Sequence, residues 1–126
     1  YYTTTKGVLE KVKAHVGDVD FAVQPELVSL LSSRNFGRYA DEKGEMKVCF
    51  ISNNDITGGN SGSAMFNSKG ELLGLAFDGN WEAMSSDILY EPKMQRTIGV
   101  DVRYILFMIE KYGKAGNLIK ELNIIN

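Results

Sequence analysis

The chain has 126 residues, of which 44% are hydrophobic and 24% are charged, and its formal net charge is -2. These values are ordinary for one soluble globular domain and exclude the strong positive charge typical of nucleic-acid-binding proteins. No apolar run approaches the roughly 20 residues of a membrane span, and a single cysteine, Cys49, excludes an internal disulfide and a cysteine-rich metal site.

Hydrophobic spacing and turn residues predict the first elements. The chain begins "YYTTTKG", without an initiator methionine or a signal peptide, so we expect a piece of a longer protein. "PELVSLLSS" (25–33) predicts a short helix, because Pro25 suits a first helical turn and three leucines share one face. "MKVCFIS" (46–52) predicts a buried strand, with Cys49 as a buried thiol.

The second half of the chain predicts more strands and then helices. "NSKG" indicates a hairpin turn between strands near 63–67 and 71–77, and "QRTIGVD" (95–101) indicates another strand. Asp101 is expected to cap a helix that ends at Gly113, followed by a last short helix in "NLIKELN". These elements predict a mainly β fold, a small antiparallel barrel or sandwich closed by a C-terminal helix.

The stretch "DITGGNSGSAMFN" (55–67) places one hydroxyl, Ser61, among three glycines. A surface hairpin would use such glycines for its positive φ angles. A nucleophile loop would use them to expose Ser61 and to aim the backbone N–H groups of Gly59 and Ser61 at an oxyanion. The loop leads into a hairpin whose second strand returns past it, which resembles the chymotrypsin-like serine proteases. Asn60, where that family usually has aspartate, resembles its bacterial branches.

The strings "FDGNWEA" and "QRTIGVDVRY", together with the serine loop, resemble the bacterial dipeptidyl-peptidase 7 and dipeptidyl-peptidase 11 family over residues 45 to 122. This resemblance implies a serine exopeptidase that releases dipeptides from peptides with a free N-terminus. It implies that Ser61 is the nucleophile, that Gly59 contributes to the oxyanion hole, that Asp78 binds the α-amine and that Gly79 lies at the S1 pocket. Glycine at 79 implies a hydrophobic P1 residue, whereas arginine there would imply Asp or Glu.

The family resemblance also implies an architecture and a setting. Residues 1–101 would form the second barrel of a chymotrypsin-like double β-barrel, with a helical segment at 102–123. The first barrel and a helical domain would belong to the same parent chain, which would be a homodimer in the periplasm or at the surface of a Gram-negative bacterium. No cofactor or metal is expected.

A serine triad needs a histidine base and an orienting carboxylate. The one histidine, His15, lies near Asp18 and Asp20, but the resemblance places the triad histidine and aspartate in the first barrel. We therefore expect this chain alone to be inactive. The alternatives are an endopeptidase of the glutamyl-endopeptidase or HtrA type and a non-catalytic β-barrel binding module.

Overall fold

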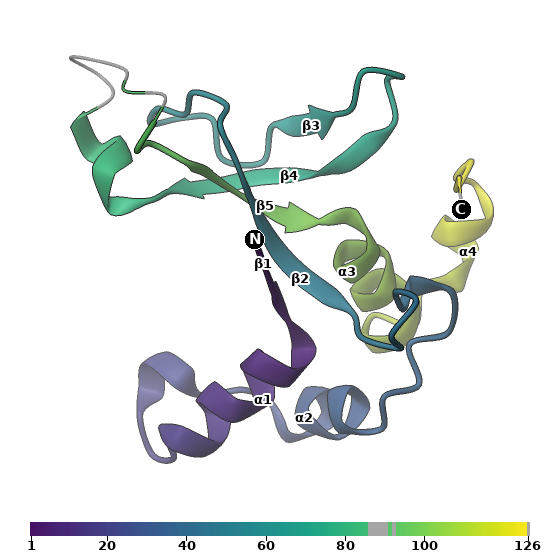
Figure 1. Ribbon diagram of the computed structural model, residues 1–126. Coiled ribbons are helices and arrows are strands. Elements are labelled where there is room, and N and C mark those ends of the chain that lie inside the picture. The colour runs from purple at the N-terminus through teal and green to yellow at the C-terminus, as the bar shows by residue number, and fades with distance from the viewer. Residues whose placement is uncertain (86–90, 92, 126) are drawn as a thin grey trace. The chain divides into compact units, whose positions relative to one another are not determined.

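The computed structural model describes residues 1–85, 91 and 93–125. The chain forms two compact units: Tyr1–Tyr2 with Cys49–Val102, and Thr3–Val48 with Arg103–Asn126. Each unit is described by itself. Their elements, in chain order (Figure 1), are β1 (Tyr2–Thr4), α1 (Thr5–Ala14), η1 (Val19–Phe21), α2 (Pro25–Ser32), η2 (Gly37–Tyr39), β2 (Lys47–Ser52), β3 (Ala64–Phe66), β4 (Leu72–Gly79), η3 (Trp81–Ser85), β5 (Thr97–Asp101), α3 (Val102–Phe107), η4 (Met108–Tyr112) and α4 (Gly116–Lys120).

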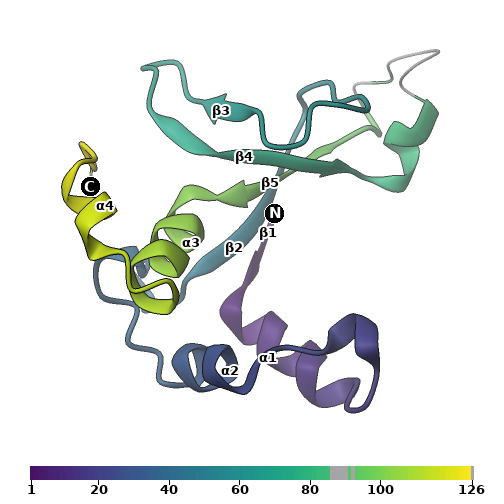
Figure 2. The same cartoon turned by 180° about the vertical axis from the view of Figure 1, so that it is seen from behind.

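A five-stranded sheet has the order β1-β2-β5-β4-β3, so that β4 lies between β3 and β5 (Figure 2). The pairs β2–β5, β3–β4 and β4–β5 are antiparallel. The turn from β3 to β4 is set by Asn67, whose side-chain oxygen accepts the N–H groups of Lys69 and Glu71 at 2.9 and 3.0 Å. Gly70 supplies the positive φ of +78° that this turn needs.

The pairing of β4 with β5 is interrupted near the end of β4. Ala76 pairs with Gly99, and Asp78 pairs with Ile98, so Phe77 is an extra residue in the ladder. A bulge of this kind bends a strand and redirects its side chains and carbonyls. The end of β4, after Phe77, therefore runs in a different direction from the first half of the strand.

The core of the first unit is small and apolar. Ile56, Ala76 and Ala83 are each 8% exposed, and Met65 packs against them. Gly74 allows β4 to approach β5 closely, because a Cβ at that position would lie 2.1 Å from the Val100 carbonyl oxygen. The sheet and the loops around its end are therefore tightly packed where β4 and β5 meet.

The second unit is helical. Phe107 of α3 is fully buried, and Phe36 and Tyr39 contact its ring edge-to-face, with centroid distances of 5.7 and 6.2 Å. The Tyr39 hydroxyl donates a 2.7 Å hydrogen bond to Glu110, and its burial together with this carboxylate raises the pKa of Tyr39 to about 12. Tyr39 therefore stays a neutral donor across the physiological range, which suits a buried partner of a carboxylate.

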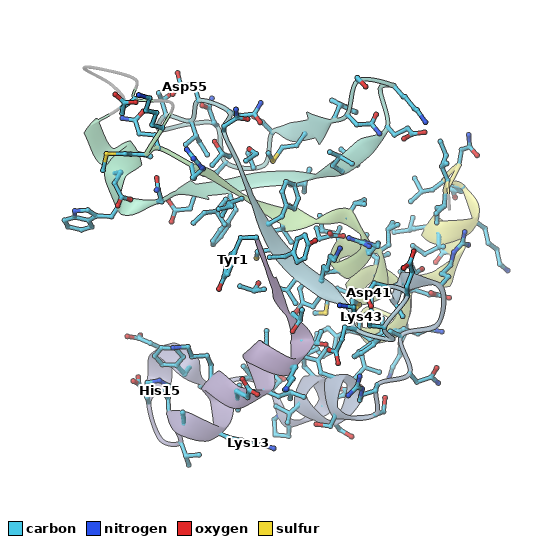
Figure 3. All side chains as sticks on the ribbon, viewed as in Figure 1. Tyr1, Lys13, His15, Asp41, Lys43 and Asp55 are labelled. Atoms are coloured by element: carbon cyan, nitrogen blue, oxygen red, sulfur yellow. The ribbon has the colours of Figure 1, made fainter. Side chains whose placement is uncertain are left out.

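A tight turn follows η2 in the same unit. The backbone N–H groups of Glu45 and Lys43 donate to the Asp41 carboxylate at 3.0 and 2.9 Å (Figure 3). These bonds lower the pKa of Asp41, because they favour its charged form. Gly44 completes the turn with a φ of +72°.

Most predicted elements are present, and the mainly antiparallel β architecture is confirmed. The helix at 25–33 is α2, the strand at 46–52 is β2, and the hairpin strands are β3 and β4. The predicted chymotrypsin-like barrel and its boundary near residue 101 stay predictions. Among the described residues, no helix is both long and apolar enough to cross a bilayer.

Two predictions about the remaining elements need correction. The helix expected to run from Val102 to Gly113 is α-helical only as far as Phe107 and then continues as the π-helical turn η4. Cys49, expected to be buried, is half-buried on β2. The helix α1 was not predicted from the sequence at all.

Candidate active site

The loop that carries Ser61 is held in shape by its neighbour Asn60. The Asn60 side-chain oxygen accepts hydrogen bonds from the backbone N–H and the hydroxyl of Thr57, at 2.8 and 3.3 Å. The Asn60 N–H donates in return to the Thr57 carbonyl oxygen at 3.2 Å. This reciprocal pair closes the turn Thr57–Asn60 from within, so the turn does not depend on a charged partner.

The two glycines beside Ser61 have backbone angles that other residues rarely adopt. Gly59 has a φ of +94° and Gly62 a φ of +88°, both in the region that favours glycine. Within the described part of the chain, the N–H groups of Gly59 and Ser61 make no hydrogen bond. They are the two donors that the sequence predicts for an oxyanion, and both remain available to a substrate.

Ser61 lies against the bulge at the end of β4. Its hydroxyl donates to the carbonyl oxygen of Phe77 at 3.3 Å. The backbone N–H of Gly62 donates to the Ala76 carbonyl oxygen at 2.7 Å. The carbonyl oxygen of Ser63 accepts the Ala76 N–H. The structure therefore brings Ser61 beside the strand segment that leads directly into Asp78 and Gly79.

Asp78 is exposed, and one oxygen of its carboxylate accepts the N–H of Gly79 at 2.8 Å. This bond fixes the carboxylate against the backbone of its own strand end. The exposed carboxylate is able to pair with an ammonium group, since a charged hydrogen bond of this kind is stronger than a neutral one. Asp78, the predicted amine-binding residue, thus directly follows Phe77, whose carbonyl oxygen accepts the hydrogen bond from the Ser61 hydroxyl.

Gly79 is half-buried and pairs with Thr97 across the sheet. A Cβ at this position would lie 2.8 Å from the Cβ of Ala83 and 3.3 Å from Cγ2 of Ile56. The nearest side-chain neighbours of this position are therefore apolar, and they leave no room for a Cβ. All four predicted site residues, Gly59, Ser61, Asp78 and Gly79, belong to the first compact unit.

Sequence reasoning missed Asn80, which anchors the turn after Gly79. Its side-chain nitrogen donates to the Met94 carbonyl oxygen, and its side-chain oxygen accepts the Arg96 N–H, both at 2.8 Å. Its own carbonyl oxygen accepts the Ala83 N–H at 2.9 Å, at the start of η3. An asparagine directly after a strand is a turn signal, but the sequence does not indicate which distant carbonyl it would bind.

The neighbouring Trp81 is 81% exposed. It therefore does not cover the core of its unit, because a covering tryptophan would be largely buried. Of the same string, the side chain of Met84 lies outside the described residues.

The one histidine belongs to the second unit, at the end of α1 (Figure 3). Its ring stacks on Phe21 with a centroid distance of 4.1 Å. The carboxylate of Asp18, three residues further along the chain, accepts the Asp20 N–H at 3.0 Å and caps η1. The described residues also hold no cluster of three His, Cys, Asp or Glu side chains that could bind a metal ion.

Comparison with known proteins gives this arrangement a family. A model of the Peptidase S46 family matches residues 1–124. The chain is 60% identical over 125 residues to dipeptidyl-peptidase 7 of Porphyromonas endodontalis, and the match covers 99% of this chain and 15% of that protein. It is 48% identical over 124 residues to an Asp/Glu-specific dipeptidyl-peptidase of Capnocytophaga gingivalis, covering 98% of this chain and 17% of that protein.

A solved structure shares the fold. The crystal structure of Porphyromonas endodontalis DPP11 in complex with the dipeptide Arg-Glu superposes with a TM-score of 0.89 at 43% identity. The match covers 95% of this chain and 17% of that one. The chain therefore spans about a sixth of the length of the proteins that it matches.

Proposed function

The chain belongs to the Peptidase S46 family, and from this we propose that it forms the C-terminal part of a serine-type dipeptidyl-peptidase. The enzyme removes dipeptides from peptides with a free N-terminus. The observation that carries this proposal is the hydrogen bond from the Ser61 hydroxyl to the Phe77 carbonyl oxygen. It holds the nucleophile beside the strand end that carries Asp78 and Gly79.

Each site residue has one role in the proposed reaction. A histidine outside this chain takes the proton of Ser61, whose oxygen attacks the carbonyl of the second substrate residue. The N–H groups of Gly59 and Ser61 stabilise the oxyanion. The shortened peptide leaves as an amine with that proton, and water then hydrolyses the dipeptidyl ester on Ser61.

Asp78 binds the N-terminus of the substrate and thereby makes the enzyme an exopeptidase. Its exposed carboxylate pairs with the substrate's α-ammonium group, so cleavage falls at a fixed distance from a free N-terminus. An endopeptidase cuts within a peptide and does not need a carboxylate that binds the α-ammonium group. Asp78 thus separates the proposed function from the endopeptidase alternative.

Gly79 sets the preference for the P1 residue, which we propose to be hydrophobic. The relatives do not support this preference, because they include proteins named Asp/Glu-specific. It rests on Gly79 itself, whose nearest side-chain neighbours, Ala83 and Ile56, are apolar. A P1 pocket with apolar walls favours an apolar side chain over a carboxylate.

The remaining parts of the enzyme are proposed from the same family membership. The first barrel and a helical domain precede this segment in one chain, and the first barrel supplies the triad histidine and aspartate. This segment forms the second chymotrypsin-like barrel. The enzyme is a homodimer in the periplasm or at the surface of a Gram-negative bacterium.

Paired reporter dipeptides on the full-length enzyme test this proposal. The reporters carry a free or a blocked N-terminus and either Leu or Glu at P1. We expect cleavage of free-amine reporters only, with Leu preferred, and its loss in Ser61→Ala.

Asp78→Asn should raise KM for the free-amine reporters by about tenfold or more, because a charged hydrogen bond is lost.

Ser63→Ala is the matched control for Ser61→Ala. Ser63 is another exposed serine of the same loop, and its hydrogen bonds to Asn60 and Ala76 use only its backbone. It should therefore retain activity. Cleavage of blocked reporters would establish an endopeptidase. Retained cleavage in Ser61→Ala would show that Ser61 is not the nucleophile, and a parent that cleaves no reporter would leave the binding module.

A further inference from the structure

The backbone at Gly79 does not itself require glycine. Gly59 and Gly62 have positive φ angles, but Gly79 is not among the glycines that do. An L-amino acid could therefore adopt the backbone conformation at position 79 without strain. The reason for glycine must lie in what surrounds the position.

The surroundings of Gly79 leave no room for a side chain. A Cβ there would lie 2.8 Å from the Cβ of Ala83 and 3.3 Å from Cγ2 of Ile56. Two carbon atoms in contact normally lie about 3.5–4.0 Å apart. The first atom of any side chain at position 79 would therefore overlap the methyl group of Ala83.

Ala83 has little freedom to move away. It is 8% exposed and packs with Ile56, Ala76 and Met65. Its N–H is bonded to the Asn80 carbonyl oxygen, and Asn80 is anchored in turn by three hydrogen bonds to Met94 and Arg96. The contact with Cγ2 of Ile56 is less close, at 3.3 Å, and would be relieved by a shift of only a few tenths of an ångström.

We propose that Ala83 is a specificity-determining residue, because its methyl group keeps position 79 as glycine and so keeps the P1 pocket uncharged. This inference rests on the proposed function, since it takes Gly79 to line that pocket. An arginine at 79 would be the direct way to bind an acidic P1 residue, because its guanidinium pairs with a carboxylate in two parallel bonds. Ala83 acts through position 79 and touches no reacting atom.

The test is a pair of variants in the full-length enzyme, assayed on free-amine reporters with Leu or Glu at P1. Gly79→Arg alone should lose activity on the Leu reporter and gain none on the Glu reporter. The double variant Gly79→Arg/Ala83→Gly should gain kcat/KM on the Glu reporter by about tenfold or more over Gly79→Arg, a difference typical of one pocket contact.

A matched control removes the same methyl group from the same cluster. Ala76 is as buried as Ala83 but is not among the three atoms nearest to a Cβ at position 79. Gly79→Arg/Ala76→Gly should therefore gain no activity on the Glu reporter. An equal gain from Ala76→Gly would mean that loosening the cluster suffices and would overturn the role of Ala83.

Thermal unfolding provides a readout that does not depend on activity. Gly79→Ala should lower the unfolding midpoint in the parent background, and this drop should disappear in the Ala83→Gly background but persist in the Ala76→Gly background. Equal drops in all three backgrounds would overturn the steric argument. So would a Gly79→Arg variant that gains Glu activity without Ala83→Gly.

The two proposals fail in distinguishable ways. If the parent enzyme cleaves no free-amine reporter, the proposed function fails and the specificity role of Ala83 falls with it. The unfolding midpoints would still decide whether Ala83 excludes a side chain at 79. If the parent cleaves as proposed and the double variant remains inactive on the Glu reporter, only the inference about Ala83 is wrong.

Discussion

At the scale of single residues, Asn60 holds the shape of the serine loop through its side chain. Its side-chain oxygen accepts two hydrogen bonds from Thr57, and these bonds hold the turn that carries the N–H of Gly59. In Asn60→Ala this acceptor is lost, so the two N–H donors lose their fixed geometry. We expect kcat to fall by roughly 10- to 100-fold with a smaller change in KM, because the donors act mainly in the transition state.

Asn60→Asp is the variant that separates this role from a general disturbance of the loop. An aspartate keeps an acceptor oxygen for the Thr57 N–H and hydroxyl. It should therefore retain most of the activity in steady-state assays of the full-length enzyme. If Asn60→Asp lost as much as Asn60→Ala, the hydrogen bonds to Thr57 would not be what positions the loop.

At the scale of elements, the close contact of β4 with β5 depends on Gly74. A Cβ there would lie 2.1 Å from the Val100 carbonyl oxygen and 2.9 Å from Cε1 of Phe50. The first of these is backbone, which cannot turn aside. Gly74→Ala should therefore lower the free energy of unfolding by about 1–3 kcal/mol, the usual cost of overpacking, as measured by denaturant titration.

Gly7→Ala is the control for adding one methyl group. Gly7 lies within α1, and nothing lies within 4 Å of the position that its Cβ would take. Alanine is a better helix former than glycine by roughly 0.5–1 kcal/mol. Gly7→Ala should therefore stabilise the protein, and a destabilisation equal to that of Gly74→Ala would contradict the packing argument.

The elements also show which structural features a single sequence reveals. The strands and α2 follow from apolar spacing and turn residues, which are local properties. The sequence signal for α1 is weak, because its first turn has no acidic residue and Gly7 disfavours a helix interior. The π-helical turn η4 was missed because its hydrogen bonds differ from those of an α-helix by one residue, a difference that apolar spacing does not reveal.

In the candidate site too, the sequence predicts the residues that have local signals and does not predict those whose roles depend on distant contacts. Ser61, Gly59, Asp78 and Gly79 are predicted from the serine loop and the family resemblance, and the structure places all four in one unit. The anchors Asn80 and Ala83 were not found. Their roles depend on which distant carbonyls and methyl groups the fold brings to them, and no local pattern encodes that.

At the scale of the whole molecule, the chain carries the proposed nucleophile, Ser61, and a single histidine in different compact units. His15 stacks on Phe21, and Asp18 caps η1. Both groups therefore have local structural roles. The proposed function therefore takes the base that activates Ser61 from a part of the enzyme outside these 126 residues.

This assignment predicts the behaviour of two variants and of the chain alone. In the full-length enzyme His15→Ala should retain kcat on a free-amine reporter, whereas Ser61→Ala should lose it. The chain alone should show no Ser61-dependent hydrolysis, because a serine hydroxyl without a base is a poor nucleophile. Loss of kcat in His15→Ala with an unchanged unfolding midpoint, or hydrolysis by the chain alone that Ser61→Ala abolishes, would place the base within this chain.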